Sequence, residues 1–73
     1  MRNNDGIFYD IEVLDDHNEI LEFIGTFDDY KLAYYEATIR LRQVEDVHYV
    51  NLTTYHYEGC TQVVTGILPF IKE

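Results

Sequence analysis

The sequence predicts a small α+β domain in which one helix covers one face of an antiparallel sheet. Two features carry this prediction: helical periodicity between residues 26 and 44, and strand-like patterns on both sides of that segment. The predicted element order is therefore β-β-α-β-β. The 73 residues contain no repeat, linker or low-complexity stretch, so residues 1–73 are interpreted as a single domain.

The first two predicted strands form a hairpin. Residues 7–14 alternate between apolar and polar side chains, as is typical of a half-buried strand. The polar residues 15–18 are expected to turn the chain. Residues 19–25 are then predicted to return beside the first strand.

A period of two assigns the side chains of this hairpin to opposite faces. Leu21 and Phe23 are expected to join Ile11 and Val13 in the core. Glu22 is expected on the outer face. That face would hold three like charges close together: Asp10, Glu12 and Glu22. Solubility and edge protection are one explanation for such charges, and docking of a positively charged partner is the other.

The helix is predicted within residues 26–44. Thr26 followed by Asp29 resembles a capping box with Asp in place of Glu, which puts the helix start near residue 27 or 28. At about 100° per residue, one apolar arc is expected to face the core. Its members are Tyr30, Ala33, Tyr34, Ala37, Leu41 and Val44. A second apolar stripe falls on the opposite side of the helix, formed by Leu32, Tyr35 and Ile39.

Two further strands are predicted after the helix, over residues 47–58 and 62–71. Residues 58–61 between them have the composition of a tight hairpin turn. Pro69 predicts that the last strand ends there or lies at a sheet edge, where a missing N–H is harmless.

Negative charge is concentrated in the N-terminal part of the chain. The net charge is −9, and residues 1–30 contribute −8 of it, because nine acidic residues there are balanced by Arg2 alone. Such an acidic pole disfavours direct binding to nucleic acid or to an anionic membrane. A protein partner with a basic surface is favoured instead.

Candidate catalytic residues are scarce. The chain has no serine, and its sole cysteine, Cys60, falls in the predicted turn with His56 four positions earlier. Catalysis would require Cys60 as the nucleophile and His56 as its base. A cysteine in a turn is usually only a turn residue. Cys60 and the three histidines lack paired metal-ligand spacing, and the four glycines are isolated. The sequence therefore predicts no enzyme, no cofactor and no metal site.

Tyr49, Tyr55 and Tyr57 share one face of the third predicted strand. Stacking of nucleic-acid bases on such a row normally requires basic residues nearby, and these are missing. Aromatic packing across strands is the preferred interpretation.

No apolar signal-like segment follows Met1, and no apolar run approaches the roughly 18 residues that a membrane span needs. The chain is therefore predicted to be cytoplasmic and to have no membrane partner. One thiol is compatible with a reducing compartment.

The leading hypothesis is a non-catalytic acidic module that binds another protein. Its specific form is charge mimicry, in which carboxylates replace nucleic-acid phosphates in the basic groove of a target. Small size, acidity and aromatic richness are typical of phage-encoded inhibitors, which act in the host cytoplasm. The carboxylates predicted to contact the target are Asp10, Glu12, Asp15, Asp16, Glu19, Glu22, Asp28 and Asp29.

The alternative hypothesis is a homodimeric structural or assembly protein. A chain with one cysteine has no intrachain disulfide, and domains of this size often gain stability by oligomerisation. The stripe of Leu32, Tyr35 and Ile39 is the expected contact, and it is also a candidate docking surface under the leading hypothesis. An enzyme that uses Cys60 and His56 is the third hypothesis.

Overall fold

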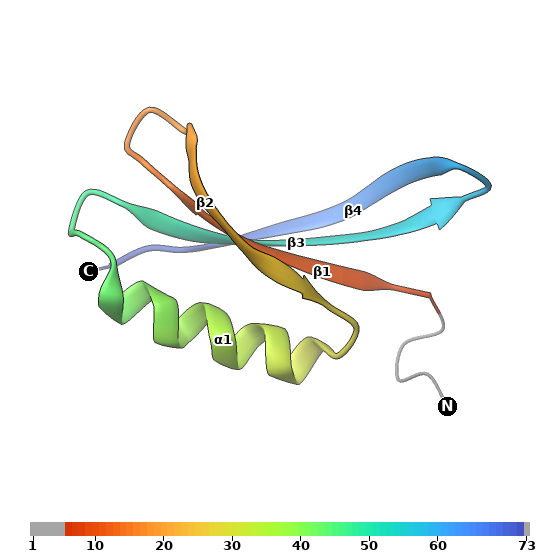
Figure 1. Cartoon of the computed structure of the whole chain (residues 1–73), viewed down its shortest axis with the longest axis horizontal. Coiled ribbons are helices and arrows are strands. Elements are labelled where there is room, and N and C mark those ends of the chain that lie inside the picture. Colours follow the sequence, from red (N-terminus) through yellow and green to blue (C-terminus); the bar gives the residue numbers. More distant parts are fainter. Residues whose placement is uncertain (1–5, 73) are drawn as a thin grey trace.

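A computed structural model describes residues 6–72 and confirms the α+β fold with one helix on an antiparallel sheet (Figure 1). The elements are β1 (Phe8–Leu14), β2 (Ile20–Phe27), α1 (Tyr30–Gln43), β3 (Tyr49–Glu58) and β4 (Thr61–Phe70). The predicted domain 1–73 includes residues 1–5 and 73, which lie outside the described residues.

The four strands form one sheet in the order β2-β1-β3-β4, and every neighbouring pair is antiparallel. β1 is therefore a central strand, and α1 crosses over it to connect β2 with β3. β1 pairs with β3 along its whole length, from Phe8 opposite Tyr55 to Leu14 opposite Tyr49. The β3–β4 hairpin extends beyond the start of α1, as Figure 1 shows.

The core lies between the sheet and α1. Ile11, Val50 and Leu52 are the largest fully buried side chains, and they come from the two central strands. Ala33 and Ala37 are fully buried on the helix. Because alanine side chains are small, the helix backbone approaches the sheet closely, and the core between the two layers is thin.

The helix begins later than the Thr26 capping box predicted. Asp29 is the N-cap, and its carboxylate accepts a hydrogen bond from the backbone N–H of Lys31 at 3.4 Å. Thr26 belongs instead to β2, because that strand continues to Phe27, which lies opposite Tyr9. The capping-box prediction was wrong because cross-strand pairing extended β2 past Thr26.

The core-facing arc of α1 is buried only in part. Ala33 and Ala37 are buried as predicted, and Leu41 and Val44 pack against the core. The two tyrosines of the arc lie at the margin of the core and remain partly exposed. Tyr30 packs edge-on against Tyr9, with ring centroids 5.5 Å apart, and Tyr34 packs against Phe70 at 5.0 Å.

An irregularity in β2 reverses the predicted sides of two residues. Gly25 lies opposite Ile11, but Phe23 lies opposite Glu12, so Ile24 is an extra residue in the β2 strand. A β-bulge of this kind shifts the inside–outside alternation by one residue. Ile24 packs against the core, whereas Phe23 is 54% exposed on the other face.

Glu22 and Leu21 are displaced by the same irregular strand. Glu22 lies opposite Val13 on the helix-covered face, and its carboxylate is 3.8 Å from the guanidinium of Arg40. A second register shift, between Val13 and Leu14, leaves Leu21 half-exposed. The predictions that Leu21 and Phe23 join the core, and that Glu22 joins Asp10 and Glu12, were therefore wrong.

The second half of the sheet follows the sequence prediction. β3 and β4 are joined at Gly59 and Cys60, where Gly59 has a φ of 65°, a left-handed conformation that glycine adopts without strain. β4 is an edge strand, in agreement with Pro69. A register shift between Thr54 and Tyr55 makes Thr65 an extra residue of β4.

Candidate functional site

One face of the sheet is not covered by α1. This open face consists of the even-numbered residues of β1, the odd-numbered residues of β3, and the residues opposite them on β2 and β4. Asp10 and Glu12 lie at its centre, next to each other along β1. Within the part of the chain that the structure describes, no helix lies over this open face.

The carboxylate of Asp10 is fixed by donors from two neighbouring strands. The hydroxyl of Thr26 on β2 donates to Oδ1 at 2.8 Å, and the hydroxyl of Tyr55 on β3 donates to the same oxygen at 2.9 Å. Burial and the hydrogen bond to Asp10 both raise the pKa of Tyr55. One carboxylate thus links β2, β1 and β3 on the open face.

Glu12 is in a less favourable electrostatic position than Asp10. Partial burial raises the pKa of its carboxyl group, and the nearby charge of Asp10 raises it further. Asn51 lies opposite Glu12 on β3, and its side-chain oxygen Oδ1 is buried without a hydrogen-bond donor among the described residues. The ionised carboxylate of Glu12 is therefore the acceptor on this face that a bound donor would stabilise.

Aromatic rings form one end of the open face. Phe8 and Tyr55 have ring centroids 5.8 Å apart, and Tyr57 lies 6.2 Å from Phe8 and 5.8 Å from Tyr55. Tyr49, at the other end of β3, donates from its hydroxyl to Oδ1 of Asn18. The packing interpretation of this tyrosine row is thus confirmed for Tyr55 and Tyr57.

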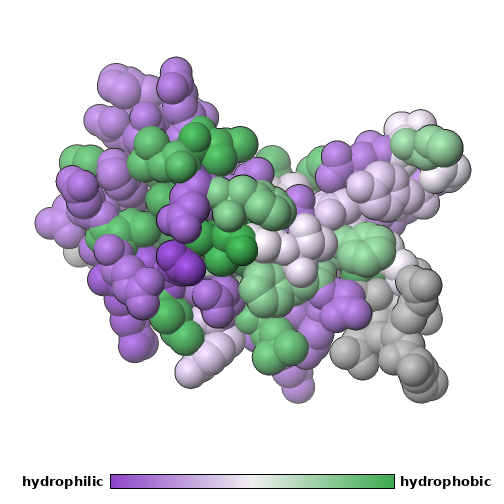
Figure 2. All heavy atoms as spheres, viewed as in Figure 1, coloured by the Kyte–Doolittle hydropathy of each residue, from purple (hydrophilic) through white to green (hydrophobic). Residues whose placement is uncertain are grey.

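Exposed apolar side chains flank the acidic centre on both sides. Ile20 and Phe23 lie on the β2 side, and Tyr57, Val64 and Ile67 lie on the β3–β4 side. Figure 2 shows apolar groups reaching the surface between hydrophilic ones over much of the molecule.

No basic side chain of the described residues lies on the open face. Lys31, Arg40 and Arg42 belong to α1, on the covered side of the sheet. Lys72 follows β4 and contacts the carboxylate of Asp46 at 3.5 Å and the carbonyl of Val44. Within residues 6–72, the negative charge of Asp10 and Glu12 therefore has no cationic neighbour on its own face.

Apart from Glu22, the remaining predicted contact carboxylates lie in two places, one at each end of β2. Asp15, Asp16 and Glu19 lie at the β1–β2 turn, where Asp15 accepts hydrogen bonds from the backbone N–H groups of His17 and Glu19 at 2.8 and 3.0 Å. These hydrogen bonds lower the pKa of Asp15. Asp28 and Asp29 lie at the other end of β2, beside the helix start.

The structure thus brings together only part of the predicted acidic set. Asp10 and Glu12 share the open face, and β1 leads directly from them to the acidic turn. Glu22 is on the covered side, next to Arg40. The sequence analysis missed Thr26, Tyr55 and Asn51 as partners of the acidic centre. An isolated glycine inside a strand often marks a bulge, so Gly25 was the one available signal for the true register of β2.

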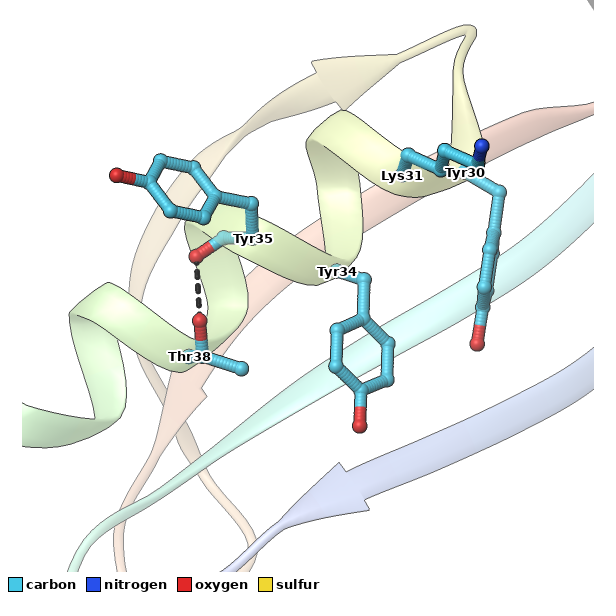
Figure 3. Close-up of a pocket in the computed structure, with 5 residues that line it drawn as sticks. All are labelled: Tyr30, Lys31, Tyr34, Tyr35 and Thr38. Carbon is cyan, nitrogen blue, oxygen red and sulfur yellow. Dashed lines mark hydrogen bonds between the residues drawn. The ribbon is translucent and has the colours of Figure 1, made fainter.

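The outer stripe of α1 is only partly accessible. Leu32 and Tyr35 are exposed, whereas Ile39 is half-buried. A shallow depression beside this stripe is lined by Tyr30, Lys31, Tyr34, Tyr35 and Thr38 (Figure 3). Tyr35 points away from Tyr30 and Tyr34 there, and the hydroxyl of Thr38 donates to the carbonyl of Tyr35 at 2.7 Å.

The residues considered for catalysis lie at the β3–β4 hairpin. Cys60 is exposed in the turn, and Nε2 of His56 lies 3.1 Å from the carboxylate of Glu58. Within residues 6–72, no three metal-binding side chains gather closely enough to hold an ion. The one helix of this part of the chain is too short and too polar to cross a membrane.

Comparisons with protein-family models, with curated proteins and with solved structures find no match for this chain.

Proposed function

We propose that this chain is a non-catalytic protein-binding module whose open face docks a partner with a basic surface. The observation that supports the proposal is the position of Asp10 and Glu12: two carboxylates in the middle of a partly apolar sheet face that has no basic side chain among the described residues. A cation from a partner would supply the missing counter-charge.

The energetics of Glu12 favour such a partner. Partial burial and the charge of Asp10 both disfavour its ionised form in the free protein. An Arg or Lys side chain placed over Glu12 would reverse that penalty by pairing with its carboxylate. The flanking Phe23, Val64 and Ile67 would add apolar contact area around this polar centre.

The same surface suits competition with a nucleic acid. Grooves that bind DNA or RNA carry arrays of Lys and Arg arranged for a row of phosphates. Asp10 and Glu12, followed by the acidic β1–β2 turn, would present carboxylates to such a groove. We therefore propose that the partner is a nucleic-acid-binding protein and that the module inhibits it in the cytoplasm of a host cell.

Affinity capture tests this function. The immobilised protein is exposed to a bacterial lysate, washed, and eluted either with a salt gradient or with double-stranded DNA. We expect a nucleic-acid-binding protein to be retained at low salt, to leave as salt screens the contact, and to be displaced by DNA. Recovery of nothing, or of a partner indifferent to both salt and DNA, would contradict the proposal.

Two charge-matched variants locate the docking surface. Glu12→Lys and Glu45→Lys change the net charge equally, but Glu12 lies on the open face and Glu45 is exposed in the α1–β3 connection. We expect capture to be lost with Glu12→Lys and retained with Glu45→Lys. Equal losses would show that total charge, rather than the open face, determines binding.

A further inference from the structure

The two free edges of the sheet differ in charge. Within the described residues, β2 and β4 each pair with one strand only, so each has an unpaired outer edge. Glu22 lies within β2, Glu19 precedes it and Asp28 follows it, whereas the ten residues of β4 carry no charge at all. A free edge with no charge is a template for pairing with another strand.

The backbone of β4 is also more regular than that of β2, and it therefore hinders pairing with another strand less. β2 has two register shifts, which bend the strand and disturb the row of outward N–H and C=O groups. β4 has one such shift, at Thr65, and Pro69 lies next to its last residue. The regular stretch from Thr61 to Val64, which precedes this shift and contains three β-branched residues, therefore stays available for pairing.

We infer that β4 pairs antiparallel with β4 of a second copy of this chain, joining two sheets into one of eight strands. The charge distribution favours a second copy at this edge over the other possible contacts. Pairing through β2 would bring Glu19 and Glu22 of two copies together, and stacking of two open faces would do the same for Asp10 and Glu12. Pairing through β4 puts the acidic β2 edges at opposite ends of the assembly.

A two-fold axis perpendicular to the sheet relates the two copies in such a pair. Both helices then lie on one side of the continuous sheet, and both open faces lie on the other. β-branched residues such as Val64 meet across the new strand pair, where contacts of this kind are favourable. The pairing does not depend on the proposed basic partner, although a dimer would present two acidic centres on one surface.

Sedimentation velocity over a range of protein concentrations tests the pairing. We expect a species of twice the 8.7 kDa chain mass that dissociates on dilution. Amide hydrogen exchange provides a second, residue-specific readout: outward N–H groups of β4 should be protected in the dimer and lose that protection on dilution, while those of β2 exchange rapidly throughout. A monomer at all concentrations, or a dimer whose β4 amides stay unprotected, would overturn the inference.

Two matched lysine variants distinguish dimerisation through β4 from dimerisation through β2. Val64 on β4 and Phe23 on β2 are 50% and 54% exposed, both on the open face. Val64→Lys would bring like charges together in the new strand pair, so we expect its dimer dissociation constant to rise at least about tenfold. Phe23→Lys adds the same charge away from the pair and should leave that constant within about twofold. Equal effects of the two variants, or a larger effect of Phe23→Lys, would contradict pairing through β4.

Discussion

The hydroxyl of Tyr55 donates a hydrogen bond to Oδ1 of Asp10 at 2.9 Å, across the β1–β3 pair. Thr26 donates to the same oxygen from the opposite side at 2.8 Å. Asp10 therefore has a structural role in addition to its charge. Glu12, two residues along the same face, is the carboxylate that remains available to a partner.

Tyr55→Phe is expected to lower the free energy of unfolding by about 1–2 kcal/mol, because it removes a hydrogen bond to a charged acceptor while keeping the buried ring. Urea denaturation at neutral pH measures the change. Tyr57→Phe is the matched control, because Tyr57 belongs to the same ring cluster but is half-exposed. If the two variants are equally stable, the hydrogen bond to Asp10 contributes nothing measurable.

Glu12→Gln is expected to stabilise the protein at neutral pH, by roughly 0.2–1 kcal/mol, because it removes a charge close to Asp10. The pKa of Glu12 is raised above its ordinary value in the folded state, so the wild type loses stability as pH rises through that folded pKa. The advantage of the variant should therefore be present at neutral pH and absent below the unfolded pKa.

Thermal denaturation of both proteins across this pH range checks the prediction. The same variant should weaken capture of the basic partner, so stability and binding are expected to change in opposite directions. An unchanged or lower stability of Glu12→Gln at neutral pH would contradict the account of Glu12.

The bulge in β2 predicts that alanine substitutions at two adjacent residues lower the free energy of unfolding by different amounts. Ile24→Ala should destabilise the fold by about 2 kcal/mol, because Ile24 packs against the core. Phe23→Ala should cost less than about 1 kcal/mol, since half of that side chain is already exposed. Chemical denaturation gives both values, and the reverse order would support the regular register without a bulge.

The helix start provides a further prediction. Asp29→Ala should destabilise the protein by about 1 kcal/mol through loss of the N-cap, and Asp29→Ser should restore most of that loss. Thr26→Ala should instead act through Asp10 and leave helix capping intact. Hydrogen exchange of the first-turn amides of α1 distinguishes the two effects. Faster exchange with Thr26→Ala alone would favour Thr26 as the cap.

Periodicity was sufficient to predict the element order. The alternation in β1, the β-rich runs of β3 and β4, and the arc through Ala33 and Ala37 are signals that each segment carries by itself. Pro69 similarly indicated the edge position of β4. These features depend on local sequence, and the structure confirms them.

The errors arose where tertiary contacts override local signals. Thr26 has the composition of a helix cap, but pairing with β1 keeps it in a strand. The bulge at Ile24 moves Phe23 out of the core and Glu22 to Arg40, which regular alternation does not predict. The hydrogen bond from Tyr55 to Asp10 joins residues 45 positions apart, and no local pattern reports it.

The most direct test of the open face as a docking surface is amide chemical-shift mapping with a defined probe. The isotopically labelled protein is titrated with a short peptide of alternating Arg and Leu, and separately with the same peptide carrying Glu in place of Arg. We predict shifts centred on Asp10, Glu12 and Asn51 with the Arg peptide, fading as salt is added, and none with the Glu peptide. Shifts confined to the outer side of α1, or equal responses to both peptides, would contradict the proposed function.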